Sequence, residues 1–140
     1  MNDSVVTSQS ISTVTAHTMV KLAVEEAEKL GVLINVSVVD SGGNPLAFIR
    51  MNGAPLHSIS IAEDKAYTSV SFGIQTSKWM DLIGDIPQLR EGLVVRDRFV
   101  IFGGGVPITV NEQVVGAIGV SGASEEQDEL CAMAGLAALG

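Results

Sequence analysis

Two histidines and one methionine of this sequence could hold a haem iron. His17 lies at the edge of an apolar stripe in an expected helix, beside Val20 and Val24. Its imidazole has two open interpretations: an axial ligand to haem iron, or a boundary histidine that makes one hydrogen bond. His57 precedes the second expected helix and could help to cap it. Met51 ends an apolar strand, so its thioether could be an axial ligand, although a methionine there more often belongs to the core.

Arg50 and Lys65 are cations in strongly apolar surroundings. A cation drawn toward a core needs an acid or an anionic ligand, and Asp40 or Asp128 could be that acid. One interpretation is a structural salt bridge that organises a hairpin and a helix. Another is a pocket for a carboxylate or a haem propionate. The same residues could also transfer a proton on a small acid, with Lys65 or Asp40 as the base and Arg50 as the clamp for the carboxylate.

Composition and spacing exclude several classes of function. Eight basic and sixteen acidic residues give a net charge of −8, which repels nucleic acid and anionic membranes, so neither is an expected partner. The single cysteine, Cys131, rules out an intrachain disulfide, and its apolar neighbours indicate a buried small side chain. No C-x-x-C-H motif for covalent haem, no metal-ligand spacing and no Ser-His-Asp order is present.

The glycine-rich stretch from Phe102 to Gly122 raises the question of a phosphate loop. No glycine is followed by the lysine and hydroxyl residue that a Walker loop needs, and Gly103 to Gly105 lead into extended residues. Two acids, Glu125 and Glu126, start the next helix and would repel a phosphate there. We expect no nucleotide. A helix packed unusually close to the last strand explains the small residues around Gly119 without a ligand.

The periodicity of apolar residues and the positions of helix-breaking and strand-breaking residues divide the chain into a tail over residues 1–10 and a single domain over residues 11–140. Short apolar runs, below the roughly 20 residues that cross a bilayer, and a start without a signal-like pattern lead us to expect a cytoplasmic protein. We predict a partly helical excursion over 76–92. The other expected elements are helices over 16–30, 59–70 and from 124, and strands over 33–40, 45–51, 93–102, 106–110 and 114–121. The candidate caps are Ser12 or Thr13 for the first helix, Ser58 or Ser60 for the second and Ser124 for the last.

Four motifs, in order along the chain, are similar to the GlcG/HbpS-type family, which also supplies the C-terminal domain of PduO-type corrinoid adenosyltransferases. They are VVDSGGNPLAFIRMNGAP (38–55), IAEDKAYTS (61–69), FGGGVPI (102–108) and VVGAIGVSGASEEQDE (114–129). The resemblance implies a profilin-like α/β (α+β) fold, with an antiparallel five-stranded sheet flanked by helices on both faces. It also implies homo-oligomers, from dimers to octamers. The sequence departs from the family pattern at Asn52, where an acid is commoner, at Ala123 and at 111–113.

Family members have been connected with haem, redox sensing or cobalamin-related metabolism. The resemblance therefore predicts a homo-oligomeric protein that binds haem or a related tetrapyrrole non-covalently. In this sequence His17 would hold the iron, and Arg50, Lys65 and Met51 would line the site. Two alternatives stay open: an accessory enzyme acting on a small carboxylate through Lys65 or Asp40, and a structural or chaperone-like oligomer.

Overall fold

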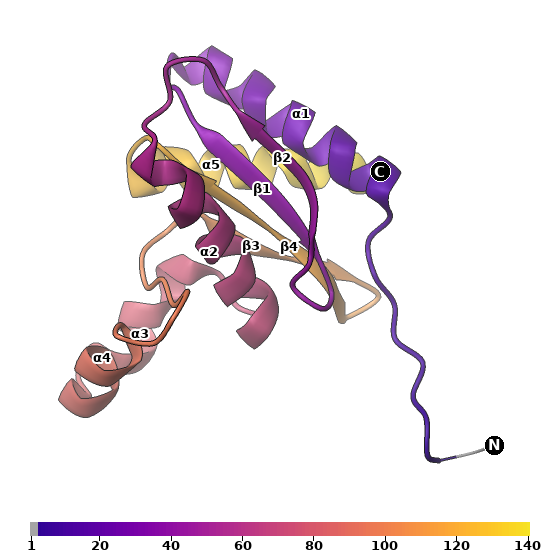
Figure 1. Ribbon diagram of the computed structural model, residues 1–140, viewed down its shortest axis with the longest axis vertical. Coiled ribbons are helices and arrows are strands. Elements are labelled where there is room, and N and C mark those ends of the chain that lie inside the picture. Colours follow the sequence, from indigo (N-terminus) through magenta and orange to yellow (C-terminus); the bar gives the residue numbers. More distant parts are fainter. Residues whose placement is uncertain (1–2) are drawn as a thin grey trace.

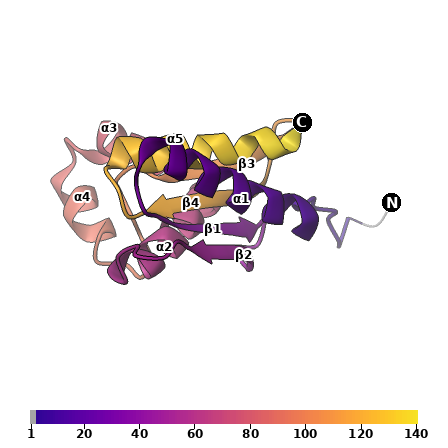
Figure 2. The same ribbon diagram turned by 90° about the horizontal axis from the view of Figure 1, so that it is seen from above.

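The computed structural model describes residues 3–140, which form a four-stranded antiparallel sheet between two layers of helices (Figures 1 and 2). The strands lie in the order β2-β1-β4-β3, so β1 and β4 are central and β2 and β3 are edges. Short 3-10 helices cover Thr76–Lys78 and Leu136–Leu139. The main elements are α1 (Thr13–Leu30), β1 (Asn35–Asp40), β2 (Pro45–Arg50), α2 (His57–Phe72), α3 (Trp79–Ile83), α4 (Pro87–Leu93), β3 (Gly105–Val110), β4 (Gln113–Ser121) and α5 (Glu125–Gly135).

The two faces of the sheet are covered by different helices. Figure 2 shows α1 and α5 on one face and α2 on the other. The main core lies under α1 and α5, where the alternating strand residues Val36, Val38, Ile118 and Val120 pack against buried helix residues. This alternation decides which face a side chain can reach, so residues of α1 and α2 cannot meet through the sheet. Within residues 3–140, no helix has both the length and the apolar character needed to cross a bilayer.

The ends of α1 and α5 follow from local sequence signals, as predicted. Ser12 caps α1 by accepting a hydrogen bond from the backbone N–H of Thr15, and Gly31 ends the helix at a φ of 72°. Ser124 and Gln127 form the expected capping box at the start of α5. For α2 the prediction of a serine cap is wrong: the cap position is Leu56, whose side chain makes no capping hydrogen bond.

The sheet has four strands, so the predicted fifth strand over 93–102 is wrong. α4 ends at Leu93, residues 94–98 form turns, and the chain from 99 to 104 is irregular up to the start of β3. The β-branched residues Val94 and Val95 suggested a strand, but both are exposed and pair with no neighbour strand. The predicted partly helical excursion over 76–92 is confirmed by α3 and α4. The relation to profilin stays a prediction.

The close packing predicted at the last strand is confirmed at Gly119. A Cβ atom on Gly119 would lie 2.2 Å from the carbonyl oxygen of Ala62 and 2.5 Å from the backbone nitrogen of Ala66, both in α2. Only glycine lets the backbone of β4 and α2 approach this closely. The bare face of β4 is therefore occupied by a helix, which seats α2 and its Lys65 directly against the central strand.

Candidate functional site

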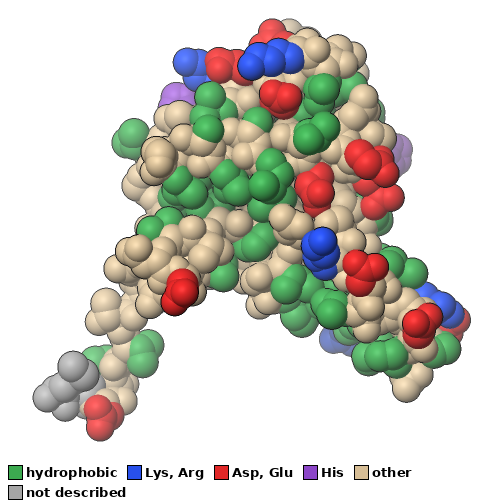
Figure 3. Space-filling view, turned by 180° about the vertical axis from the view of Figure 1, so that it is seen from behind, with side chains coloured by type: hydrophobic (Ala, Val, Ile, Leu, Met, Phe, Trp, Pro, Cys, Tyr) green, Lys and Arg blue, Asp and Glu red, His purple; other side chains and the backbone are tan. Residues whose placement is uncertain are grey.

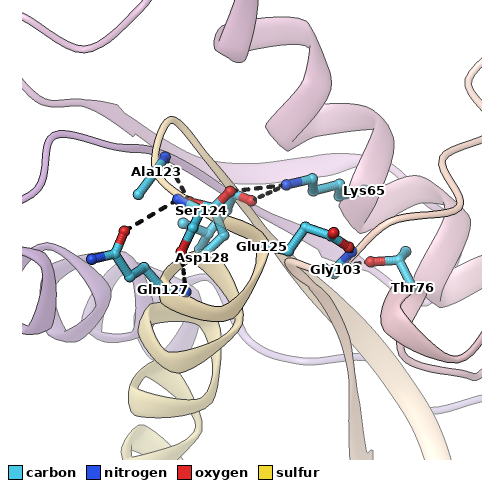
Figure 4. Close-up of polar contacts among 10 residues, drawn as sticks. Lys65, Thr76, Gly103, Ala123, Ser124, Glu125, Gln127 and Asp128 are labelled. Carbon is cyan, nitrogen blue, oxygen red and sulfur yellow. Dashed lines mark hydrogen bonds and ion pairs between the residues drawn. The ribbon is translucent and has the colours of Figure 1, made fainter.

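A buried ion pair joins α2 to the start of α5. Lys65 Nζ lies 3.1 Å from Asp128 Oδ2 and donates a second hydrogen bond, of 2.8 Å, to the carbonyl oxygen of Val120 at the end of β4. Asp128 Oδ1 accepts a hydrogen bond of 3.0 Å from the backbone N–H of Ala123. Figure 4 shows Lys65 reaching from α2 toward this turn. Of the two acids that the sequence offered as partners for Lys65, the structure therefore selects Asp128 and not Asp40.

Burial shifts both members of the pair toward their neutral forms. Desolvation lowers the pKa of Lys65, and the neighbouring Asp128 carboxylate opposes that shift. Desolvation likewise raises the pKa of Asp128, against the attraction of Lys65 and the hydrogen bond from Ala123. Both charged groups have hydrogen-bond partners, so the pair is satisfied without a ligand. Its geometry fits the structural interpretation of Lys65.

The FGGG segment wraps around the ammonium of Lys65. A Cβ atom on Gly104 would lie 2.4 Å from the carbonyl oxygen of Val120 and 2.6 Å from Lys65 Nζ, and its φ of 131° also favours glycine. The ring of Phe102 has its centroid 5.1 Å from Nζ, a cation–π contact. The glycine triplet thus leaves room for the side chain of Lys65.

Two side chains hold this segment in a way that the sequence did not predict. The backbone N–H of Gly105 donates to Thr76 Oγ1 at 2.9 Å, and that of Gly103 donates to Glu125 Oε1 at 2.8 Å (Figure 4). As an acid in the first turn of α5, Glu125 interacts favourably with the helix dipole, and the sequence suggested no further role for it. Thr76 lies in a stretch without apolar periodicity, so nothing in its neighbourhood marks it as important. Both contacts join residues more than 20 positions apart, so no local pattern reports them.

An open pocket lies beside the pair, at the end of the sheet where β1 begins and β2 and β4 finish. We call it the edge pocket; its volume is about 380 Å³. Arg50 does not line the pocket itself, but its Nη2 donates a hydrogen bond of 2.8 Å to the carbonyl oxygen of Ala54, which lies between the lining residues Gly53 and Pro55, so we place Arg50 at the rim. Met51 Sδ accepts a hydrogen bond of 3.4 Å from the backbone N–H of Ile34. The pocket is lined by Gly31, Val32, Leu33, Gly53, Pro55, Gly122, Ala123 and Gln127.

The structure gathers three of the predicted binding residues at this edge and leaves His17 elsewhere. Arg50 and Met51 flank the pocket, and Lys65 lies behind the Gly122–Ala123 wall through its bond to Asp128. His17 is exposed in the second turn of α1, and about 20 Å of helix separates it from Leu30, next to the pocket. His17 and Met51 of one chain therefore cannot ligate the same iron.

Asp40 lies at the opposite end of the hairpin from Arg50, because Arg50 pairs with Asn35 at the start of β1. Its Oδ1 accepts hydrogen bonds of 2.9 Å from the backbone N–H groups of Gly42 and Asn44. These contacts organise the hairpin turn. The three residues proposed for proton transfer are thus not assembled in one site.

The described residues 3–140 contain no cluster of three or more His, Cys, Asp or Glu arranged to hold a metal ion. Cys131 is buried and has no disulfide partner, as predicted. Burial, with smaller contributions from Asp128 and Glu26, raises the pKa of its thiol to about 12. Two further open pockets, of about 210 and 500 Å³, lie around the hairpin turn at Ser41 and Gly42, and neither is lined by a histidine or a charged residue.

Comparison with known proteins agrees with the four sequence motifs. An uncharacterized 15.0 kDa protein of Citrobacter freundii, from the dhaT-dhaS intergenic region, is 40% identical over 129 residues, which are 89% of this chain and 91% of that protein. A double mutant of HbpS from Streptomyces reticuli is 35% identical with a TM-score of 0.89, and the match covers all of this chain and 94% of HbpS. A PduOC–haem complex is 32% identical with a TM-score of 0.84, over 92% of this chain and 94% of PduOC. Residues 11–137 match the family model described as haem degrading protein HbpS-like, and the chain belongs to this HbpS-like family.

Proposed function

We propose that this chain binds haem or a related tetrapyrrole non-covalently, with His17 as the ligand to the iron. The observation that carries the proposal is the exposed imidazole of His17 on α1. On a helix, residues three and four positions apart are neighbours, which places Val14 and Lys21 on either side of it. An imidazole for the iron, an exposed valine for the macrocycle and an ammonium for a propionate are the groups that non-covalent haem needs. Membership of the HbpS-like family and the similarity to the PduOC–haem complex support the same ligand.

The edge pocket suits a small anion better than a haem iron. Its lining residues include no histidine, cysteine or tyrosine, and the sulfur of the neighbouring Met51 accepts a hydrogen bond from Ile34. The guanidinium of Arg50 can form a fork with a carboxylate, so a propionate or a free carboxylate fits this rim. Arg50 is therefore assigned to a separate anionic subsite, whereas Met51 and Lys65 already have partners within the chain, in Ile34 and Asp128.

The same proposal includes assembly into a dimer or a larger homo-oligomer in the cytoplasm. A haem held only by His17 would have one face against a single helix and the other in water. A second copy could cover that face, which makes assembly and binding compatible.

Haem titration with matched histidine variants tests the proposal. Haemin added to the wild-type chain should give a shifted Soret band, and His17→Ala should abolish the ligand-dependent shift. His57→Ala is the control, because His57 is the other exposed histidine and lies two residues after Pro55 of the edge pocket. Loss of the shift in His57→Ala alone would move the site to the edge pocket, and no shift in the wild type would refute haem binding.

An accessory enzyme for a small carboxylate is the second candidate, favoured by the guanidinium of Arg50 beside the edge pocket. It lacks an assembled base, because Asp40 organises the hairpin turn and Lys65 is paired with Asp128. Calorimetric titration with short mono- and dicarboxylates tests it: binding that Arg50→Gln weakens at least about tenfold would favour this candidate. No contact among the described residues favours a chaperone-like oligomer over these two.

A further inference from the structure

Residues 76–100 form an arm that projects from the body of the molecule. Figure 1 shows α3 and α4 extending away from the sheet and from the other helices. These helices have five and seven residues, and α4 contributes no buried residue to the fold. Helices this short are marginal in water unless another surface covers them. The arm therefore has the features of a segment that is completed by contact with a partner.

Apolar side chains are concentrated on the arm and beside its root. Val95 is 79% exposed and Leu82 is 56% exposed, values far above those of a packed apolar side chain. In Figure 3, hydrophobic side chains gather on the projecting part and on the adjoining body. Contiguous exposed apolar surface of this kind marks interaction sites. The other exposed apolar residues of this surface are Met80, Leu89 and Val94 on the arm and Phe72 at its root.

Both ends of the arm are firmly anchored. At the entry, Ser77 Oγ donates a hydrogen bond of 2.6 Å to Glu129 Oε1, and Trp79 packs edge-on against Phe72 and Phe99. At the exit, Arg98 forms an ion pair of 2.9 Å with Asp64.

The backbone of Arg98 has an unfavourable conformation at the point where the arm returns to the body of the molecule. Its φ is 64°, in the left-handed region, while its guanidinium stacks 3.8 Å from the centroid of the Tyr67 ring. Thr68 Oγ1 donates to its carbonyl oxygen at 2.8 Å. Strained residues persist where their surroundings fix them. The arm is thus held in one orientation before any partner arrives, which lowers the entropic cost of binding.

The distribution of charge indicates what the partner is. Of the eight basic and sixteen acidic residues, four of each lie in 76–100, which leaves four basic and twelve acidic residues elsewhere. The arm is neutral and the rest of the chain holds the whole net charge of −8. Two copies that met through other surfaces would bring strongly acidic bodies together, whereas two arms can meet without net repulsion.

We propose that the arm is the surface through which two copies of this chain associate. This inference rests on the proposed homo-oligomer and adds the interface to it. In a two-fold contact the same patch faces itself, so the apolar side chains of one arm cover those of the other. The mixed charges around them, such as Arg90 and Glu91, can pair between copies. Val95 is the most exposed large apolar residue of the arm, and we take it as the central residue of the contact.

Mass measurement by light scattering on a sizing column, with matched aspartate variants, tests the interface. Val95→Asp should shift the wild-type oligomer toward smaller species and raise the dissociation constant at least about tenfold, because it buries a carboxylate without a partner. Val6→Asp is the control, since Val6 lies in the N-terminal segment, outside the arm and the proposed haem site, and is 92% exposed. Leu82→Asp should act like Val95→Asp, and circular dichroism checks that all variants are folded.

The outcomes separate this inference from the proposed function. An oligomer that survives both arm variants would overturn the arm interface and leave homo-oligomerisation intact. A monomeric wild type would overturn both, whether or not the arm binds a different protein. Dissociation by Val6→Asp, with the arm variants unchanged, would place the contact on the N-terminal segment and overturn the arm interface. Haem binding is measured separately by the Soret shift and does not decide any of these results.

Discussion

Lys65 of α2 and Asp128 of α5 form an ion pair of 3.1 Å with side chains only 1% and 3% exposed, although 62 residues separate them in the chain. The pair ties the helix on one face of the sheet to the start of a helix on the other. Each partner has a further backbone hydrogen bond, to Val120 or from Ala123. Such a pair specifies one arrangement of the two helices, because either charge left alone would be buried and uncompensated.

The first prediction concerns the energy of this pair. Lys65→Met should lower the free energy of unfolding by about 3–5 kcal/mol, because it leaves the Asp128 carboxylate buried without a cation. In Lys65→Met/Asp128→Asn the loss should be smaller than the sum of the single losses by about 2 kcal/mol. Urea unfolding of the four chains at one protein concentration measures this. The exposed pair Arg98–Asp64 is the control, with an expected coupling below about 1 kcal/mol.

The second prediction is that acidification partly restores Lys65→Met. Burial raises the pKa of Asp128 above 3.8, and the loss of the opposing Lys65 cation raises it further. Between 3.8 and the raised value, the folded chain binds more protons than the unfolded chain, so the free energy of unfolding decreases as pH increases through this window. Lowering the pH should therefore narrow the gap between the variant and the wild type. Urea unfolding at several pH values measures it, and an unchanged gap would mean that the loss of Lys65 does not raise the pKa of Asp128 further.

The third prediction concerns the contact between β4 and α2. Gly119→Ala should destabilise the fold by about 3 kcal/mol or more, since the new Cβ meets backbone atoms of Ala62 and Ala66 that cannot rotate away. Gly92→Ala is the matched control: in α4 its Cβ meets nothing within 4 Å. It should be neutral or stabilising by up to about 1 kcal/mol. Thermal unfolding compares the two, and equal midpoints would contradict the close approach.

The fourth prediction concerns the structural role of Asp40 in the hairpin turn. Asp40→Ala should cost about 1–2 kcal/mol, because the backbone N–H groups of Gly42 and Asn44 lose their shared acceptor. Asp40→Asn keeps an oxygen at that position and should stay close to the wild type in unfolding experiments. If the asparagine variant were as unstable as the alanine variant, the negative charge and not the hydrogen bonds would be the stabilising feature.

The fifth prediction is that Cys131 is unreactive in the folded chain. Its pKa of about 12 leaves only about one thiol in ten thousand ionised at pH 8, and the side chain is fully buried. A disulfide reagent monitored by absorbance should label it only after unfolding in urea, with one equivalent per chain. Rapid labelling of the folded protein would mean that this part of α5 opens readily.

The sequence by itself determined the local features, because each depends on residues within a few positions of one another. Ser12 and Gly31 delimit α1, Ser124 and Gln127 cap α5, and the motifs from Val38 to Glu129 identify the family. The bare face of β4 around Gly119 also predicted close packing correctly.

Only the tertiary structure decided what depends on residues far apart in the chain. It selected Asp128 as the partner of Lys65, placed Asp40 at the far end of the hairpin from Arg50, and put His17 and Lys65 on helices that cover opposite faces of the sheet. It also left turns and irregular backbone over 94–104 in place of the expected fifth strand, since β-branched residues form a strand only where a neighbour offers them hydrogen bonds. The number of residues between two positions does not give their distance in space. Side chains become buried only when the helices and the sheet pack together.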